Sequence, residues 1–209
     1  MATQPSHDQK IDPLCSISLR ATLMTGYLKQ RLIYHFSKAE QIEEPILRTK
    51  LWSAMDTETG LAILTETEWS PDLTEFRPGI VISRNDLKTL QAGINNQMMG
   101  ETWDATGREH YSSYTEGSST MFCISSVPRE AEILGAEVYI DMMRFSSHIR
   151  QDMRLQRFFA AGMGKLFKIK EARDNYAVPV TVAYAAEEKW EIQPFAPYLK
   201  TLQMTAFLP

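Results

Sequence analysis

Cysteines are few in this sequence and long apolar runs are missing, and both absences restrict its class. Two cysteines among 209 residues, Cys15 and Cys123, cannot build a disulfide framework; two free thiols are expected, with one bridge as the alternative. No stretch approaches the roughly 20 apolar residues of a membrane-spanning helix. The polar first ten residues lack the apolar core of a secretory signal. We therefore expect synthesis and folding in a cytoplasm, without membrane binding.

Motifs of catalysis and metal binding are absent as well. None of the four histidines forms an H-E-x-x-H pattern, and neither cysteine has a C-x-x-C partner. The segment 162–165 ends like a phosphate-binding loop, but Phe159 and Leu166 replace the first glycine and the final hydroxyl residue of that motif. We therefore predict no catalytic residue, no metal and no cofactor.

What is present is the composition of a globular protein. Apolar residues make up 44% of the chain and charged residues 23%. The net charge of −4 disfavours a general nucleic-acid-binding protein, although it leaves room for a local basic patch.

The apolar patterns predict an α+β protein. Apolar residues at three- and four-residue spacing predict an N-terminal helix over 13–37 and a central amphipathic helix over 129–147. Segments 46–52 and 61–65 read as the two strands of a hairpin, and strands are expected at 80–83, 120–124 and 176–184. Pro179 inside the last strand indicates a sheet edge or a bulge. Because long crossovers between strands are missing, the sheet should be mainly antiparallel.

These elements indicate one domain with two extensions. Residues 1–12 are expected to be a disordered or extended arm, and 13–190 a single α+β domain. Residues 84–118 have no clear period and are expected to form a long loop, part of which could be strand. The proline-bearing residues 191–209 are expected to form an extended tail.

Charge is distributed unevenly along the chain. Residues 53–76 carry six acidic and no basic side chains, whereas 144–174 carry eight basic and three acidic ones. Each region could be a solvated face, or the two could be complementary surfaces of neighbouring copies in a head-to-tail contact. The basic region could also face DNA phosphates. The candidate interface residues are Asp56, Glu58, Glu66 and Glu68 on the acidic side and Arg144, Arg150, Arg154, Arg157, Lys165, Lys168, Lys170 and Arg173 on the basic side.

Methionines are frequent, and two of them stand in the long loop. Met98 and Met99 would be core filler if buried, and an adaptable contact surface if exposed. We include both among the candidate interface residues.

The order of elements resembles a known family. The expected elements are, in order, a leading helix (14–36), a hairpin, a strand introduced by Pro78, a helix from Ala131 to Phe145 and closing strands from Val178 to Trp190. This order is similar to that of head–tail connector proteins of tailed bacteriophages, most closely the tail terminator group. The similarity covers about 13–190 and rests on element order rather than on a diagnostic motif. The loop 84–118 and the tail exceed the compact terminator pattern, which leaves terminator, stopper and adaptor positions open.

That resemblance implies a structural virion protein and no catalysis. Copies would form a ring, usually a hexamer, that terminates the tail tube and joins it to the head-side connector or adaptor. Genomic DNA would pass through the lumen without sequence-specific binding. The protein would be made in the host cytoplasm and reside in the virion neck.

Two other functions compete with this interpretation. A cytoplasmic enzyme or ligand-binding protein could build a site from scattered polar residues near 84–118, and the cluster to inspect there is Asp104, Arg108, Glu109 and His110. A regulatory DNA-binding module would need a helix that presents base-reading side chains, and no helix-turn-helix spacing is apparent.

Overall fold

In the residues that the structure describes, the fold is that of an α+β protein with an eight-stranded, mostly antiparallel sheet and three α-helices. It is known from a computed structural model that describes residues 17–52, 60–75, 77–90, 102–103, 109–169 and 175–192. The helices are α1 (Ile17–Phe36), α2 (Pro128–Arg144) and α3 (Ser146–Asp152). The strands are β1 (Ala62–Thr65), β2 (Gly79–Arg84), β3 (Lys88–Leu90), β4 (Thr102–Trp103), β5 (Glu109–Ser125), β6 (Arg157–Met163), β7 (Phe167–Lys168) and β8 (Tyr176–Ile192).

The sheet is built around its two longest strands. Its order is β1-β2-β5-β8-β6, with β3 and β4 added to β5 and β7 added to β8. The β1–β2 pair is parallel, and every other pair is antiparallel. Strands β5 and β8 pair over their full 17 residues, from Glu109 opposite Ile192 to Ser125 opposite Tyr176.

Both long helices pack on one face of the sheet. The spacing in α1 places Met24, Leu28 and Leu32 on one side, all fully buried, and the expected stripe of α2 is confirmed by the burial of Leu134 and Val138. They join one core with alternate residues of the strands, which are Ile80, Ile82, Met121, Cys123, Val178, Val180 and Val182. On the opposite face a small cluster around Val81, Ile124 and Ala177 packs with Trp69 and Phe122.

Two residues of the sequence explain where α2 starts and how closely it approaches the sheet. Pro128 occupies the first turn, where a backbone N–H has no helical acceptor. Gly135 lies so close to β8 that a Cβ there would stand 2.8 Å from the Cγ1 of Val178. The glycine therefore lets α2 approach the sheet closely.

The expected hairpin is wrong. Residues 46–52 contain a 3-10 helix, Leu47–Thr49, instead of a strand. Local hydrogen bonds close this turn, because Thr49 Oγ1 donates to the Ile46 carbonyl at 2.8 Å and Arg48 Nε to that of Ile42 at 2.8 Å. Strand β1 pairs with β2 in parallel, and Trp52 adds one isolated bridge to Leu61.

The expected loop over 84–118 is also partly wrong. It contains β3, β4 and the first ten residues of β5. Glycines and polar residues hide this strand in the sequence, because neither of its faces is continuously apolar there. Residues 91–101 and 104–108, the N-terminal 1–12 and the tail beyond Ile192 lie outside the described residues.

Pro179 marks neither a sheet edge nor a bulge in its own strand. Strand β8 is central, and Pro179 stands opposite Phe122 of β5. On its other side β6 pairs with residues 180–185 and β7 with 176–177, so Pro179 lies where the neighbouring strand is interrupted. Its carbonyl accepts the Gly164 N–H at 2.7 Å. The N–H that proline lacks would therefore have pointed to the interruption between β6 and β7, where the sheet needs no hydrogen bond from it.

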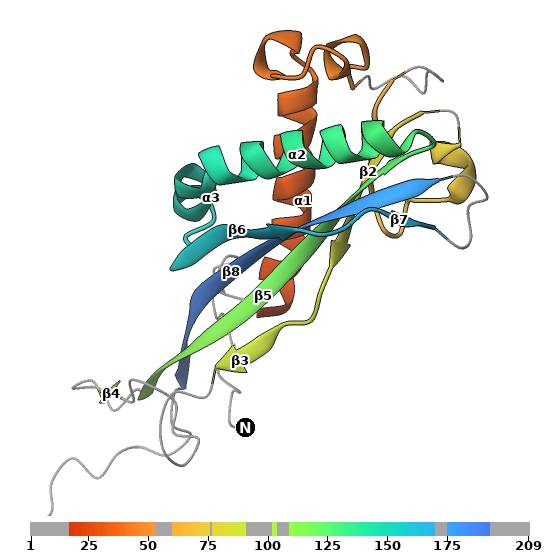
Figure 1. Ribbon diagram of the computed structural model, residues 1–209. Helices are drawn as coiled ribbons and strands as arrows, with labels where there is room; N and C mark the ends of the chain where they lie inside the picture. The colour runs from red at the N-terminus through yellow and green to blue at the C-terminus, as the bar shows by residue number, and fades with distance from the viewer. Residues whose placement is uncertain are drawn as a thin grey trace, which may run out of the picture.

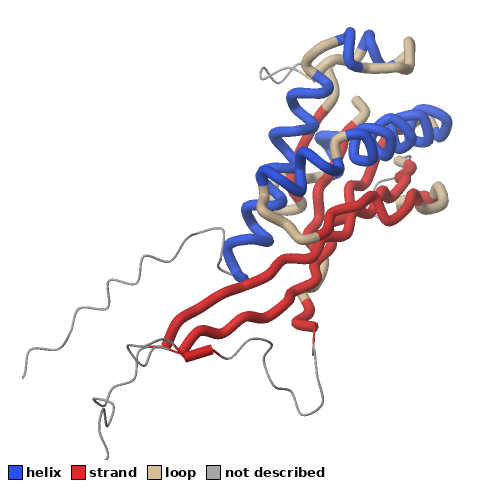
Figure 2. Tube along the Cα trace, turned by 90° about the vertical axis from the view of Figure 1, so that its left-hand side faces the viewer, coloured by secondary structure: helices blue, strands red, loops and turns tan. Residues whose placement is uncertain are grey.

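The β5–β8 pair continues past the helices as a projecting ribbon (Figures 1 and 2). Thr115 and Ala186, which stand opposite each other, are still buried, at 3% and 0% exposure. Six register pairs follow, from Tyr114 opposite Glu187 to Glu109 opposite Ile192. We call residues 109–114 and 187–192 the arm. At about 3.3 Å per residue, it is about 20 Å long.

Candidate functional site

The most concentrated polar cluster is buried between α1 and α2. His35 Nε2 lies 3.0 Å from Glu137 Oε1, and His35 Nδ1 lies 3.1 Å from Asp141 Oδ1. Arg31 reaches both oxygens of Asp141, with Nη2 at 2.5 Å and Nε at 3.2 Å. Each helix contributes two residues at four-residue spacing, and this spacing places them on one helix face. The sequence analysis did not identify this cluster. The signal that could have predicted it is a pair of basic residues and a pair of acidic residues, each at i, i+4 spacing beside the apolar stripe of its helix.

The charges of this cluster compensate one another. Burial alone would lower the pKa of His35, but hydrogen bonds to Asp141 and Glu137 and their charges raise it to about 9. Burial would raise the pKa of Glu137, but hydrogen bonds from His35 and from the Glu43 N–H outweigh burial and lower it. Two cations thus face two carboxylates. His35 is only 4% exposed, so the cluster links α1 and α2 in a place that is sealed from solvent.

A basic surface lies at the end of α3 and the start of β6. We define it by Arg150, Arg154 and Arg157, all exposed. Arg154 has a φ of 49°, in the left-handed region that favours glycine. The turn is closed by the Leu155 N–H on the Arg150 carbonyl at 2.8 Å and by the Arg154 N–H on that of Gln151 at 3.1 Å. An arginine therefore occupies a glycine-type helix cap and bears charge there.

The outer edge of β6 continues this surface. Strand β6 is the last strand in the sheet order, and no described strand pairs with its outer side. The guanidinium of Arg157 lies 5.7 Å from the centroid of the Phe159 ring, which is 46% exposed. The pairing with β8 shifts register between Ala160 and Gly162, and such a bulge is typical of sheet edges.

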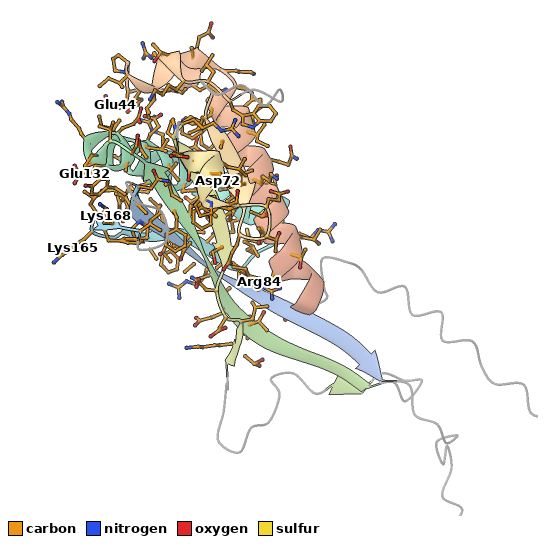
Figure 3. All side chains as sticks on the ribbon, turned by 90° about the vertical axis from the view of Figure 1, so that its right-hand side faces the viewer. Glu44, Asp72, Arg84, Glu132, Lys165 and Lys168 are labelled. Carbon is orange, nitrogen blue, oxygen red and sulfur yellow. The ribbon has the colours of Figure 1, made fainter. Side chains whose placement is uncertain are left out.

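The remaining basic candidates do not gather with these three. Arg144 forms an ion pair with Glu43. Lys165 and Lys168 lie together beyond the other end of β6, away from the arm, and Lys168 stands 5.9 Å from the Tyr176 ring centroid (Figure 3). Lys170 and Arg173 lie outside the described residues.

The acidic candidates have partners within their own chain or lie outside the description. Glu68 pairs with Lys29 at 2.6 Å and accepts the Thr65 N–H at 2.8 Å, and these contacts lower its pKa. Glu66 accepts a hydrogen bond from Ser83 at 2.6 Å. Asp56, Glu58, Met98 and Met99 lie outside the described residues.

An open pocket of about 250 Å³ lies beside the base of the arm. The charged residues Asp86, Lys88, Glu116 and Arg157 line it together with the aromatic residue Phe159. Gly117 forms part of its floor, where a Cβ would stand 2.6 Å from the Tyr184 ring. Half of the ten lining residues thus belong to 84–118.

The polar cluster expected near His110 is only partly described. Asp104 and Arg108 lie outside the described residues. Glu109 and His110 belong to β5, opposite Ile192 and Glu191, and therefore to the arm.

Other reactive groups are few. Burial raises the pKa of the Cys123 thiol, which is fully enclosed and therefore unreactive. Across the described ranges, no three His, Cys, Asp or Glu side chains gather as a metal site. None of the described helices has both the length and the apolar character to cross a bilayer.

No protein-family model matches the chain, and no curated protein matches it either. The arm, the basic surface and the pocket therefore carry no role transferred from a relative.

Proposed function

We propose that the protein is a structural virion component of the phage neck, a subunit of a ring that terminates the tail tube and joins it to the head-side connector. The observation that carries this proposal is the arm. It is a narrow ribbon of β5 and β8, with the two-residue strand β4 added to β5 at its tip, where Thr102 and Trp103 pair with His110 and Glu109. A ribbon of so few strands gains little stability by itself in water, so one that projects beyond its domain suits a subunit that contacts a neighbour. The neck location rests on the resemblance of the sequence to connector proteins, although the hairpin of that resemblance is replaced by a 3-10 helix and a parallel β1–β2 pair.

The described surface supports assembly better than catalysis. The most buried polar cluster is sealed between helices, and the fully buried Cys123 offers no accessible nucleophile. The exposed features are an arm, an unpaired edge at β6 and an arginine surface. These are parts that a ring subunit uses, because each can be complemented by another copy.

Imaging of tails tests the proposal. Purified protein is mixed with tails that lack it, and the tail ends are examined by negative-stain electron microscopy. Caps or rings at one end of the tube are expected. Bare tube ends in the presence of folded protein would overturn the assignment to the neck.

Small-ligand binding is the second candidate, and the pocket beside the arm favours it. Its lining combines two basic residues, Lys88 and Arg157, with two acidic ones, Asp86 and Glu116, and this composition suits a small zwitterionic molecule. Isothermal titration with free amino acids would test it. Binding that disappears in Arg157→Ala would favour a ligand-binding function, whereas absence of heat would remove this class of ligand.

A further inference from the structure

We propose that the acidic arm of one copy docks on the basic surface, Arg150, Arg154 and Arg157, of a second copy. This inference deepens the proposed function, on whose premise of an assembling subunit it rests. It also replaces the acidic segment 53–76 by the arm as the complement of the basic region.

The arm is acidic although its two strands are distant in the sequence. Its carboxylates are Glu109, Glu187, Glu188 and Glu191, against the single cation Lys189 and a neutral His110. The β5–β8 register brings these residues together within six consecutive pairs. The result is a local formal charge of −3 on a ribbon about 20 Å long.

The basic surface has the matching chemistry. Three exposed arginines stand within eight residues, with Asp152 as the one acidic residue in that stretch. Asp152 itself accepts a hydrogen bond from Tyr27 at 2.5 Å. Guanidinium groups bind carboxylates through two parallel hydrogen bonds, and this geometry adds specificity to charge attraction. The exposed Phe159 ring beside Arg157 offers apolar contact area.

Within its own chain, the base of the arm lies next to this surface, where Gln156 Nε2 donates a hydrogen bond to Glu187 Oε2 at 3.5 Å. Strand β6 begins at Arg157, opposite Ala185, and β8 continues past that point for seven more residues, to Ile192. Continuous pairing with β5 directs the end of β8 away from β6. The proposal therefore assigns the positions farther out on the ribbon, 188, 191 and 109, to the arginine surface of another copy.

Such a contact is heterologous, because the two surfaces differ. Repetition of it generates a closed ring when the rotation between copies closes and an open filament when it does not. Charge attraction of this kind mainly increases the rate and the register of encounter.

Disulfide trapping between full-length copies tests the contact. In a Cys15→Ser background, which leaves only the buried Cys123, Ser113→Cys marks the arm and Gln151→Cys marks the basic surface. The two proteins, one tagged, are mixed at low salt under mild oxidation. We expect the heterodimer to form about tenfold faster than with Glu132→Cys, an exposed control on α2, and the excess to vanish in 1 M salt, where screening is strong.

Charge exchange separates docking from damage to the fold. Arg150→Glu with Arg157→Glu on the Gln151→Cys protein should reduce trapping to the control rate. Glu188→Lys with Glu191→Lys on the arm protein should restore it, since the attraction is then reversed in sign. Equal trapping at arm and control cysteines, or failure of the exchange to restore it, would overturn the proposal.

DNA is the rival occupant of the basic surface. If duplex DNA abolished trapping while the arm reversal failed to restore it, the arginines would be a phosphate-binding surface and the proposal would fail. The assignment to the neck is tested separately from the docking contact. If the disulfide forms but the tail ends stay bare, the docking contact is retained and the neck assignment is rejected. If the tails are capped but no disulfide forms, the neck assignment is retained and the docking contact is rejected.

Discussion

The helix-covered body and the arm are stabilised in different ways. In the body, α1 and α2 seal one face of the sheet, and even the charged residues between them are paired and buried. In the arm, the same two central strands continue without a helix and with a surplus of carboxylates. β5 and β8 therefore stabilise the fold at one end, and in our proposal they contact a partner at the other.

The largest expected effect is a loss of stability in the helix-covered body, caused by a substitution that does not touch the arm. Asp141→Ala should lower the free energy of unfolding by about 3–5 kcal/mol, because it leaves Arg31 and His35 buried beside a single carboxylate. Urea denaturation measures this loss. The matched control on α2 is the exposed Glu132→Ala, expected to cost less than about 0.5 kcal/mol. Similar midpoints for the two variants would contradict the role given to the cluster.

The same cluster predicts a dependence of stability on pH. The folded-state pKa of His35, about 9, lies above its ordinary value of 6.5, so its contribution is complete below pH 6.5 and is lost as the pH rises through 9. The loss should reach about 3 kcal/mol at most. On the acid side, the lowered pKa of Glu137 gives stability that is lost as the pH falls below its ordinary value of 4.5. Denaturation curves between pH 6 and 9.5 should show the alkaline loss, and His35→Gln should flatten it.

A smaller effect is expected where body and arm meet. Gly117→Ala would place a Cβ 2.6 Å from the Tyr184 ring and 2.7 Å from Leu87, which should cost about 1–3 kcal/mol. Hydrogen exchange should show faster exchange in β5 and β8 near this position than in α2. Gly26→Ala in α1, where a Cβ meets nothing within 4 Å, is the control and should not destabilise. Uniform exchange in both variants would argue against a packed joint.

Arg154→Gly should change stability in the opposite direction. Glycine adopts the left-handed conformation of this cap without the cost borne by arginine, so a gain of up to about 1 kcal/mol is expected in thermal denaturation. Association through the arm should weaken at the same time. A variant that loses stability would show that the Arg154 side chain contributes more through its contacts than the backbone gains.

The smallest effect on stability accompanies the clearest effect on assembly. Changing Arg150, Arg154 and Arg157 together to Glu should alter the free energy of unfolding by less than about 1 kcal/mol, because all three side chains are exposed. It should nevertheless block assembly, measured as virion yield after complementation. Normal yield from this triple variant would remove the basic surface from the assembly contact.

Sequence periodicity predicted the elements that bury a continuous apolar stripe. The helices α1 and α2 and the strands β1 and β2 were found in this way, because Leu28 or Ile80 leaves a regular signal. The segment 46–52 misled because its β-branched and apolar residues serve a short turn closed by local hydrogen bonds.

The candidate sites were harder to predict because they depend on register. The arm joins residues that lie more than 70 positions apart, such as Ser113 and Glu188. The charge of 144–174 was visible in the sequence, yet Arg150, Arg154 and Arg157 lie at the end of α3 and the start of β6, whereas Lys165 and Lys168 follow the other end of β6. The acidic residues at 187–191 were the signal for the arm in the sequence. Their pairing with β5, which forms the arm, was not visible there.

The position of β8 has a consequence for how the chain folds. As the last described strand, β8 sits between β5 and β6, so the sheet lacks its centre until residues 176–192 have left the ribosome. Until then β5 and β6 expose unpaired edges to any other chain nearby. Because pairings between distant segments form slowly, the β5–β8 ladder should form late in folding, and the chain should be prone to aggregation before it forms.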